Sequence, residues 1–292
     1  MYVLRAIGLM VLGMALLAAS DAFIKLSSQH APTGQIMMSI GAGGAGLLLV
    51  LARLRRMPIR AADALHRMVL LRNALEMVGG LGMIIGLSKI PLSVMAAIMQ
   101  TAPLVVTMGA ALFLGEEVGW RRWSAIAVGL VGMLMVIRPF GAAFTGWEIF
   151  AVVGVTGLAA RDLITRLAPA HVPSVVISAW GFASIIPVGL ALLLVTAQTP
   201  VATPLATTFI IGAIAVTTAG YVCVTTAMRI APASAVSPFR YSRLVFTTAL
   251  GMLVFAERPD GWTLAGAALI LGAGLYSFLR ERRLARSAAI AL

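Results

Sequence analysis

Apolar runs of about 20 residues recur from one end of this chain to the other, and a helix of that length crosses a hydrocarbon layer about 30 Å thick. Hydrophobic residues make up 61% of the 292 residues and charged residues only 11%, whereas about a quarter of a soluble domain is charged. The pattern therefore predicts an all-α integral membrane protein. A transmembrane β-barrel would need alternating segments of about ten residues, which the sequence lacks.

The apolar runs, and the prolines between them, predict ten transmembrane helices. These cover residues 4–26, 33–52, 67–87, 91–114, 122–138, 146–168, 173–196, 205–228, 233–256 and 261–280. The connections are short, so no extramembrane catalytic domain fits between the helices. We therefore expect the protein not to be an enzyme.

The net charge of +12 at first suggests a nucleic-acid partner. The placement of the cations argues otherwise, because with the N-terminus inside most Lys and Arg lie at cytoplasmic helix ends. This bias predicts that both termini are cytoplasmic. We expect no nucleic-acid partner, and we expect the basic tail at 281–292 to contact anionic lipid.

The sequence gives no sign of a metal, a cofactor or a nucleotide. Cys223 is the only cysteine, so we expect a small buried hydrophobe. The three His lie near predicted loops and form no metal site, and no Walker motif is present. ATP-driven transport is therefore unsupported, and we expect no cofactor.

One polar segment, called the repeated phrase below, occurs twice in this apolar chain. Residues 18–26 read AASDAFIKL and residues 159–167 read AARDLITRL, so that Asp21 and Asp162 hold the same place in the two copies. Further matches between the two halves follow at a spacing of 140. They are Leu104 with Leu244, Thr107 with Thr247, Glu117 with Glu257, and Gly132 with Gly272.

The repeat divides the chain into two units of five expected helices, at 1–140 and 141–280, followed by the tail at 281–292. Because five is odd, the second unit enters the membrane from the opposite side. Inverted repeats of this kind are typical of transporters whose binding site lies near the middle of the bilayer.

Asp21 with Lys25, and Asp162 with Arg166, have the spacing at which two side chains share a helix face and can form an ion pair. The first pair is expected near the outer end of the first helix, and the second near the inner end of the sixth. In one interpretation they are two gates, one broken as the other forms. In the other they only orient helix ends, or the long cations reach toward the interface.

The order of the markers in both halves resembles the two EamA domains of bacterial drug/metabolite transporters. The markers are an early Arg in the third helix, a Pro in the fourth, an acidic residue before a turn, and a closing Gly-rich helix. The residues are Arg72, Pro103, Glu116 and Glu257. The resemblance implies a central cavity lined by helices one to four and six to nine, with the fifth and tenth helices at the periphery. Members export amino acids and other metabolites, or import solutes such as riboflavin or S-adenosylmethionine.

Charged residues inside a membrane are costly, so each invites a functional interpretation. Arg72 and Glu76 lie four residues apart on the third helix. Glu76 is either a proton carrier or a permanent partner of Arg72. Arg240 suits a carboxylate or phosphate of the substrate. Alternatively, Arg240 and Arg243 pair with Glu76 or Asp162.

Other candidates offer apolar walls or adaptable polar groups. Trp180 and Tyr221 suit amino acids and aromatic metabolites, or are ordinary packing residues. The remaining candidate contacts are Gln35, Ser39, Met99, Gln100 and Tyr241. The acidic residues Glu116, Glu117 and Glu257 are expected to end helices at the surface.

Together these features predict a secondary transporter of the bacterial inner membrane. We expect it to export amino acids, aromatic ones included, and related small metabolites by alternating access. The alternative within transport is an uptake carrier for riboflavin or S-adenosylmethionine. A lipid-modifying membrane enzyme is the alternative of a different class, but no cluster of nucleophile, base and metal ligands supports it. We expect a small-molecule substrate and membrane lipid as partners, and a monomer or a weak dimer.

Overall fold

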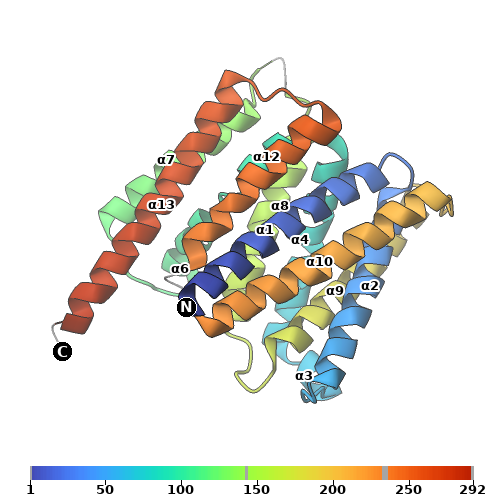
Figure 1. Ribbon diagram of the computed structural model, residues 1–292, viewed down its shortest axis with the longest axis horizontal. Helices are drawn as coiled ribbons and strands as arrows, with labels where there is room; N and C mark the ends of the chain where they lie inside the picture. Colours follow the sequence, from blue (N-terminus) through green and yellow to red (C-terminus); the bar gives the residue numbers. More distant parts are fainter. Residues whose placement is uncertain (1, 142–143, 232–235, 291–292) are drawn as a thin grey trace.

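The computed structural model describes residues 2–141, 144–231 and 236–290, and these residues form a helical bundle without strands (Figure 1). The helices of the first half are α1 (Tyr2–Ser27), α2 (Thr33–Leu54), α3 (Ala61–Ala64), α4 (Arg67–Lys89), α5 (Leu92–Met99), α6 (Ala102–Phe113) and α7 (Trp120–Ile137). Those of the second half are α8 (Glu148–Thr165), α9 (Ser174–Val195), α10 (Pro204–Ile230), the 3-10 helix η1 (Ser237–Tyr241), α12 (Ser242–Phe255) and α13 (Gly261–Ile290).

Within the described residues, eight helical segments are long and apolar enough to cross a membrane, so this is a multi-pass membrane protein. They are α1, α2, α4, the α5–α6 pair, α7, α9, α10 and α13. Helix α8 is not among them because three of its 18 residues are charged, and α12 is not because it has only 14 residues. The expected number of ten spans stays a prediction.

Prolines set several helix boundaries. Pro32 and Pro173 directly precede α2 and α9, each of which has 22 residues. The expected helix at 91–114 is broken between α5 and α6. The break follows from Pro103, which lacks an N–H group and whose ring clashes with the carbonyl four residues earlier. The expected boundary at Pro232 lies outside the described residues.

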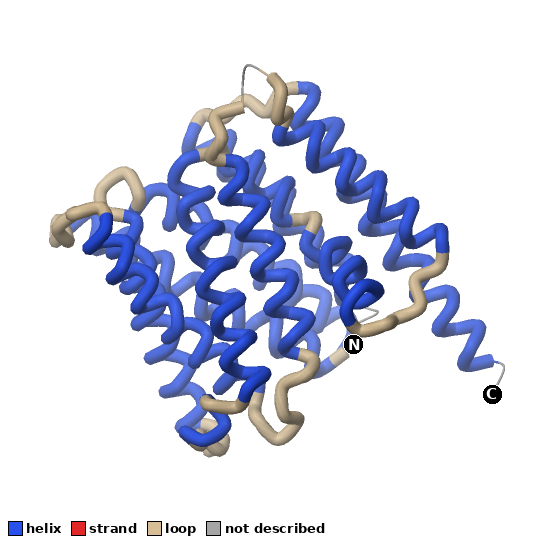
Figure 2. The backbone as a smooth tube through the Cα atoms, turned by 180° about the vertical axis from the view of Figure 1, so that it is seen from behind, coloured by secondary structure: helices blue, strands red, loops and turns tan. Residues whose placement is uncertain are grey.

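The helices pack as two copies of one arrangement. Helix α1 lies along α10, α4 along α8, α2 along α9, and α7 along α13. If each helix is replaced by its counterpart in the other half, the α1–α10 pair becomes the α8–α4 pair. The α2–α9 and α7–α13 pairs are then unchanged. In both ribbon and tube views α7 and α13 stand together at one edge of the bundle, which is the peripheral position that the family resemblance implies (Figures 1 and 2).

Glycines allow the closest of these approaches. A Cβ on Gly82 of α4 would lie 2.5 Å from the backbone nitrogen of Gly154 on α8. A Cβ on Gly13 of α1 would lie 3.1 Å from the carbonyl oxygen of Gly220 on α10. Gly13 precedes the first copy of the repeated phrase by the same interval as Gly154 precedes the second. The same position of each repeat thus uses a glycine to bring two backbones into contact.

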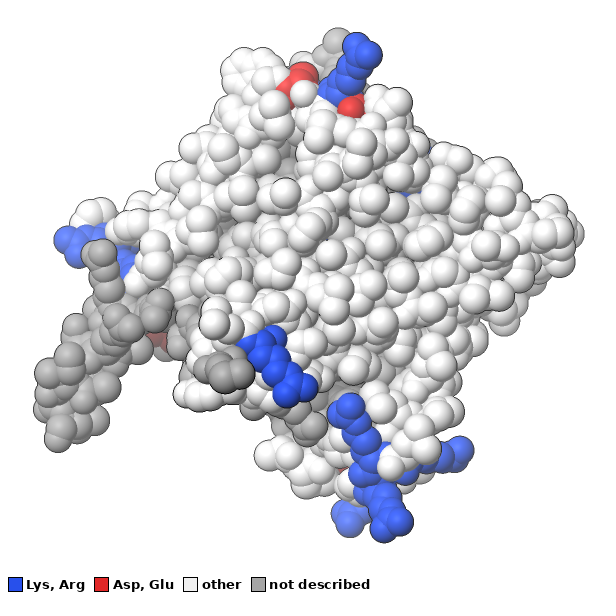
Figure 3. Space-filling model, in the orientation of Figure 1, with Lys and Arg blue, Asp and Glu red and all other residues white. Residues whose placement is uncertain are grey.

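The surface separates apolar and charged regions along the bundle. Figure 3 shows one face on which uncharged residues form a broad area, with Lys and Arg side chains toward its margins. The start of α1 and the end of α13 lie toward the same end of the bundle (Figures 1 and 2). This distribution suits a bundle whose middle is surrounded by lipid.

Candidate functional site

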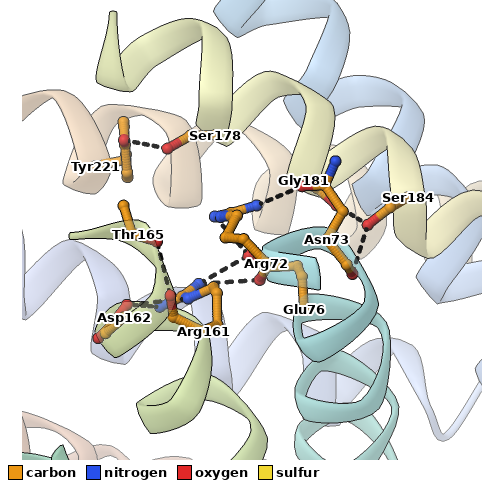
Figure 4. A network of polar contacts seen from close by, with 10 residues as sticks. All are labelled: Arg72, Asn73, Glu76, Arg161, Asp162, Thr165, Ser178, Gly181, Ser184 and Tyr221. Atoms are coloured by element: carbon orange, nitrogen blue, oxygen red, sulfur yellow. Dashed lines mark hydrogen bonds and ion pairs between the residues drawn. The ribbon is translucent and has the colours of Figure 1, made fainter. Parts of the chain in front are cut away.

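A network of four charged side chains joins α4 to α8 (Figure 4). Arg72 Nη2 lies 2.7 Å from Glu76 Oε2, and Arg161 Nη1 donates to both oxygens of Glu76 at 3.0 Å. Arg161 also donates from Nε and Nη2 to Oδ1 of Asp162, at 3.0 and 2.7 Å. We call Arg72, Glu76, Arg161 and Asp162 the α4–α8 network.

Neighbouring helices complete the walls of this network. Arg72 Nη1 donates to Asn73 Oδ1 at 3.1 Å, and its guanidinium lies against α9 at Gly181, where any side chain would collide with it. Ser178 of α9 shares a hydrogen bond with the hydroxyl of Tyr221 on α10 (Figure 4). Residues from α4, α8, α9 and α10 therefore meet at one place in the bundle.

Glu76 is held by two arginines. The predicted pair of Arg72 and Glu76 is present, and Arg161 adds a second cation from the other repeat. A carboxylate with two charge-assisted partners is favoured in its ionised form. This geometry favours the interpretation of Glu76 as a permanent ion-pair partner over that of a proton carrier.

A second set of charges joins α1 to α12. Arg243 donates from Nε to Asp21 Oδ2 at 3.1 Å, and from Nη2 to both Asp21 oxygens at 2.8 Å. Both oxygens of Asp21 therefore have a guanidinium partner, and its side chain is only 7% exposed. Arg243 does not take the predicted alternative partners, Glu76 and Asp162.

Glu257 binds the start of α5 as well as Lys25. It accepts from the backbone nitrogens of Leu92 and Ser93, at 2.5 and 2.9 Å, and from Ser93 Oγ at 2.8 Å. Lys25 Nζ lies 3.5 Å from Glu257 Oε1 and also donates to the carbonyl of Ile90. The expectation of a surface position is wrong for Glu257, whose side chain is 11% exposed and caps a helix of the other repeat.

The charges of the repeated phrase pair between helices and not along them. Asp21 contacts Arg243, and Lys25 contacts Glu257. Asp162 contacts its neighbour Arg161, and Arg166 lies 3.2 Å from Glu116. The predicted partners within each helix are therefore wrong, because tertiary packing supplies partners with better geometry than the exposed i,i+4 arrangement.

The structure places several of the predicted substrate contacts away from the α4–α8 network. Gln35 holds the chain before α10 through two hydrogen bonds of 2.7 Å with the backbone of Val201. Arg240 is exposed, and Tyr241 lies against Gly274 of α13. Of the expected contacts, Tyr221 lies beside the α4–α8 network and hydrogen-bonds to Ser178 (Figure 4).

The other candidates lie in or near the core. Trp180 packs on the cluster around Val176, together with Tyr221, and Met99 packs on the largest core cluster. Ser39 is half-buried on α2. Gln100 donates to the carbonyl of Tyr241 at 3.3 Å, so the break between α5 and α6 contacts the junction of η1 and α12.

Sequence reasoning missed Arg161 as a site residue. It was visible as a cation within a span, directly before Asp162 in the repeated phrase. The position that corresponds to it in the first repeat is Ser20, so the phrase itself differs at the residue that organises the network. The difference between Arg161 and Ser20 was the sequence signal that could have identified Arg161 as a site residue.

Two surface hollows lie away from the network. One of about 470 Å³ lies between residues 28–32 and 197–199, and one of about 270 Å³ lies beside Pro91, Arg138 and Glu257. Neither is the central cavity that the family resemblance implies. Among the described residues, no group of three or more His, Cys, Asp or Glu could hold a metal ion.

The sequence matches the model of the EamA-like transporter family twice, at residues 4–138 and 145–279. It is 32% identical over 222 residues to a riboflavin transporter of Rhizobium johnstonii, covering 75% of this chain and 72% of the relative. It is 26% identical over 216 residues to an S-adenosylmethionine uptake transporter of Rickettsia felis, covering 73% and 72%.

A relative that is named as an exporter is also similar. A pseudopaline exporter of Pseudomonas aeruginosa is 27% identical over 276 residues, covering 90% of this chain and 92% of the relative. One solved crystal structure covers 96% of this chain and 98% of its own, with a TM-score of 0.65 and 16% identity. At that identity the likeness shows the fold alone.

Proposed function

The chain belongs to the EamA-like transporter family, and on that premise we propose that it is a secondary transporter of small organic metabolites in the bacterial inner membrane. Its repeats, residues 1–140 and 141–280, rock against each other to give alternating access to a central site. Helices α8 and η1–α12 also cross the membrane in this proposal, which gives ten spans with both termini in the cytoplasm. The family and the relatives are transporters, so the proposal includes no enzymatic activity.

One observation carries the proposal: two ion pairs lie at matched positions of the two repeats. Lys25 pairs with Glu257, and Arg166 pairs with Glu116. Lys25 and Arg166 hold the same place in the two copies of the repeated phrase. Each pair joins the C-terminal end of the first helix of one repeat to the turn after the fourth span of the other. These four residues form the two gates of the proposal.

By local structure and ion pair the counterpart of Glu257 is Glu116, at a spacing of 141, and not Glu117, with which the sequence comparison at a spacing of 140 matched it. Glu116 and Glu257 each follow an apolar helix, in the sequences Leu-Gly-Glu and Phe-Ala-Glu. The backbone nitrogen of Glu116 donates to the carbonyl of Ala110 at 3.2 Å, and that of Glu257 donates to the carbonyl of Gly251 at 3.1 Å. The helix therefore ends in the same way before both acidic residues.

The two gates lie at opposite ends of the bundle. Lys25 is close to the end of α1, far from the N-terminus. Arg166 follows α8, in the connection whose His171 contacts Asp63 of α3 at 3.1 Å. Figure 1 shows α3 toward the end of the bundle at which α1 begins. In the proposed orientation the Lys25 gate faces outward and the Arg166 gate faces the cytoplasm.

The gates differ in strength. The Arg166 gate has a single contact between side chains that are 54% and 48% exposed, and exposed pairs contribute about 0.2–1 kcal/mol. The Lys25 gate is buried, caps α5 and is backed by the pair of Asp21 and Arg243. Removing one partner of a buried ion pair costs about 3–5 kcal/mol, because the other charge is left buried and uncompensated. The Arg166 gate therefore opens more readily, and the resting carrier opens toward the cytoplasm.

For the substrate we propose amino acids and related small metabolites, moved outward. A second candidate, uptake of riboflavin or S-adenosylmethionine, is favoured by the relatives that carry those names. Both candidates need a polar site within the membrane, and the α4–α8 network with Tyr221 supplies one. Asp21, Lys25, Arg72, Glu76, Asp162 and Arg166 remain the residues that we propose for gating or coupling.

Counterflow in proteoliposomes tests the proposal. Vesicles are loaded with unlabelled solute and exposed to a trace of the labelled form. The panel holds amino acids, riboflavin and S-adenosylmethionine. A carrier gives a transient accumulation of label for its own substrate, while empty liposomes do not. Absence of counterflow for every amino acid, with strong exchange of riboflavin, overturns the amino-acid proposal in favour of the second candidate.

A further inference from the structure

Asp21 and Asp162 occupy the same place in the two repeats but have different partners. Both oxygens of Asp21 accept hydrogen bonds from Arg243. Along this stretch the repeats match at a spacing of 140, as Leu104 with Leu244 shows, so the residue that corresponds to Arg243 is Pro103. Proline offers no cation, and the α8 side of the protein therefore lacks the arginine that closes the α1 side.

The carboxylate of Asp162 is consequently half open. Arg161 directs both Nε and Nη2 to Oδ1 of Asp162, and spends its remaining nitrogen, Nη1, on Glu76. Among the residues that the structure describes, none donates a hydrogen bond to Oδ2 of Asp162. Its side chain is 45% exposed, against 7% for Asp21. A carboxyl oxygen with no hydrogen-bond donor among the described residues thus lies beside the α4–α8 network.

We propose that Asp162 binds the ammonium group of an amine-bearing, zwitterionic substrate. The ammonium takes the place against Asp162 that Arg243 takes against Asp21. An ammonium group has three donors and a carboxylate oxygen accepts more than one hydrogen bond, so Oδ2 can bind it without releasing Arg161.

The charge balance of the site favours a zwitterion over a simple cation. The two cations and two anions of the α4–α8 network already cancel, and an uncompensated charge in a low-dielectric site is expensive. A zwitterion adds no net charge. The inference rests on the proposed transport function and names its substrate class. α-Amino acids are such zwitterions. S-adenosylmethionine carries the same ammonium and carboxylate groups but has an added sulfonium charge, whereas riboflavin has no amine that is protonated at neutral pH.

The test compares L-phenylalanine with N-acetyl-L-phenylalanine, which differ in whether the amine can carry a charge. Counterflow by the wild-type protein should be specific for the free amine. Asp162→Asn should raise the KM for L-phenylalanine and S-adenosylmethionine about 10-fold or more, as expected for loss of a hydrogen bond to a charged group. The KM of any neutral solute that is transported should change little. Asp162→Glu, which keeps the charge, should restore part of the affinity.

Asp21→Asn is the matched control, because it changes the same repeat position where the carboxylate is already bound by Arg243. Because Asp21 also supports the Lys25 gate, the variant should lower the thermal stability and slow the counterflow of every transported solute alike, without selectively raising the KM of amine-bearing solutes. The proposal is overturned if Asp162→Asn keeps the wild-type KM for L-phenylalanine and S-adenosylmethionine, or if the wild-type protein exchanges both forms of phenylalanine equally.

Counterflow of riboflavin alone by the wild-type protein would also overturn the amine site, while leaving the proposed transporter function intact. Absence of counterflow for every solute in the panel would instead remove the proposed function, and the amine site with it. A wild-type response to the free amine, followed by its loss in Asp162→Asn, supports both.

Discussion

Ser20 on α1 and Thr217 on α10 hydrogen-bond to each other at the positions that Arg161 and Glu76 occupy in the other repeat. Ser20 and Arg161 hold the same place in the repeated phrase, and Thr217 precedes Gly220 by the same interval as Glu76 precedes Gly79. The same interhelical contact is thus a neutral hydroxyl pair in one half and an ion pair in the other. The helix packing tolerates either solution, so the charges on the α4–α8 side are not required by the fold alone.

This equivalence predicts the outcome of copying one side onto the other. Glu76→Thr alone should lower the free energy of unfolding by about 3–5 kcal/mol, because it leaves the buried Arg72 without a carboxylate and Arg161 with Asp162 alone. The triple variant Arg72→Ala, Glu76→Thr, Arg161→Ser copies Ala213, Thr217 and Ser20. It should regain most of that loss, since Asp162 is the one charge of the network that remains, and its side chain is 45% exposed.

Thermal unfolding in detergent measures both variants. The triple variant should melt close to the wild type and clearly above Glu76→Thr. Its counterflow activity should nevertheless be lost if the network serves transport. Equal melting temperatures for the single and triple variants would contradict the idea that uncompensated charge causes the loss.

The two gates predict different responses to charge swapping. Arg166→Glu with Glu116→Arg should retain stability and counterflow, because an exposed ion pair is symmetric in its partners. Lys25→Glu with Glu257→Lys should not be rescued. Lysine has no acceptor, so it cannot receive the hydrogen bonds that Leu92 and Ser93 donate to Glu257.

Melting temperature and initial counterflow rate should be recorded for each single and each double variant. At the Arg166 gate the double variant should recover what either single variant loses. At the Lys25 gate it should remain as impaired as Glu257→Lys alone. Recovery at both gates would show that Glu257 acts only through its charge and that capping of α5 contributes nothing.

Local patterns located the helices and the charged positions but could not assign their partners. Pro32 and Pro173 allowed the starts of α2 and α9 to be predicted within one residue. The i,i+4 rule, in contrast, considers one helix at a time. The partner of Asp21 is Arg243, 222 residues further along the chain, and only tertiary packing brings them together.

Glu257 is a second residue whose partners could not be predicted from the local sequence. An acidic residue that follows an apolar helix and precedes a Pro has the sequence signature of an exposed turn. In the fold this turn lies against the first residues of α5, whose free N–H groups attract a carboxylate. The repeat gave the better signal, since a matched acidic residue occurs in each half.

Asp260 outside the membrane predicts a pH effect on stability. Hydrogen bonds from Thr263 at the start of α13, followed by the nearby Arg138, lower the pKa of Asp260 below its ordinary value of 3.8. A carboxyl group whose pKa is lowered in the folded state stabilises the protein above its unfolded pKa, and loses that contribution as the pH falls through the folded pKa. The wild type should therefore lose more stability than Asp260→Asn on going from about pH 5 to pH 2. Melting curves over that range check the difference, and parallel curves would contradict it.

Finally, the glycine contact between α4 and α8 predicts a strong effect from one methyl group. Gly82→Ala places a Cβ 2.5 Å from backbone atoms of α8, which cannot move aside as a side chain could. Overpacking of this kind costs about 1–3 kcal/mol and occasionally more.

Gly46→Ala on α2 is the control, because a Cβ there meets no atom within 4 Å. It should be neutral or slightly stabilising, since alanine favours helix by about 1 kcal/mol over glycine. The melting temperature of Gly82→Ala should lie below that of the wild type, and that of Gly46→Ala should lie at or slightly above it. A Gly82→Ala protein that melts with Gly46→Ala would mean that α4 and α8 are not in backbone contact, and the α4–α8 network would then lack the rigid frame that positions Arg161 against Glu76.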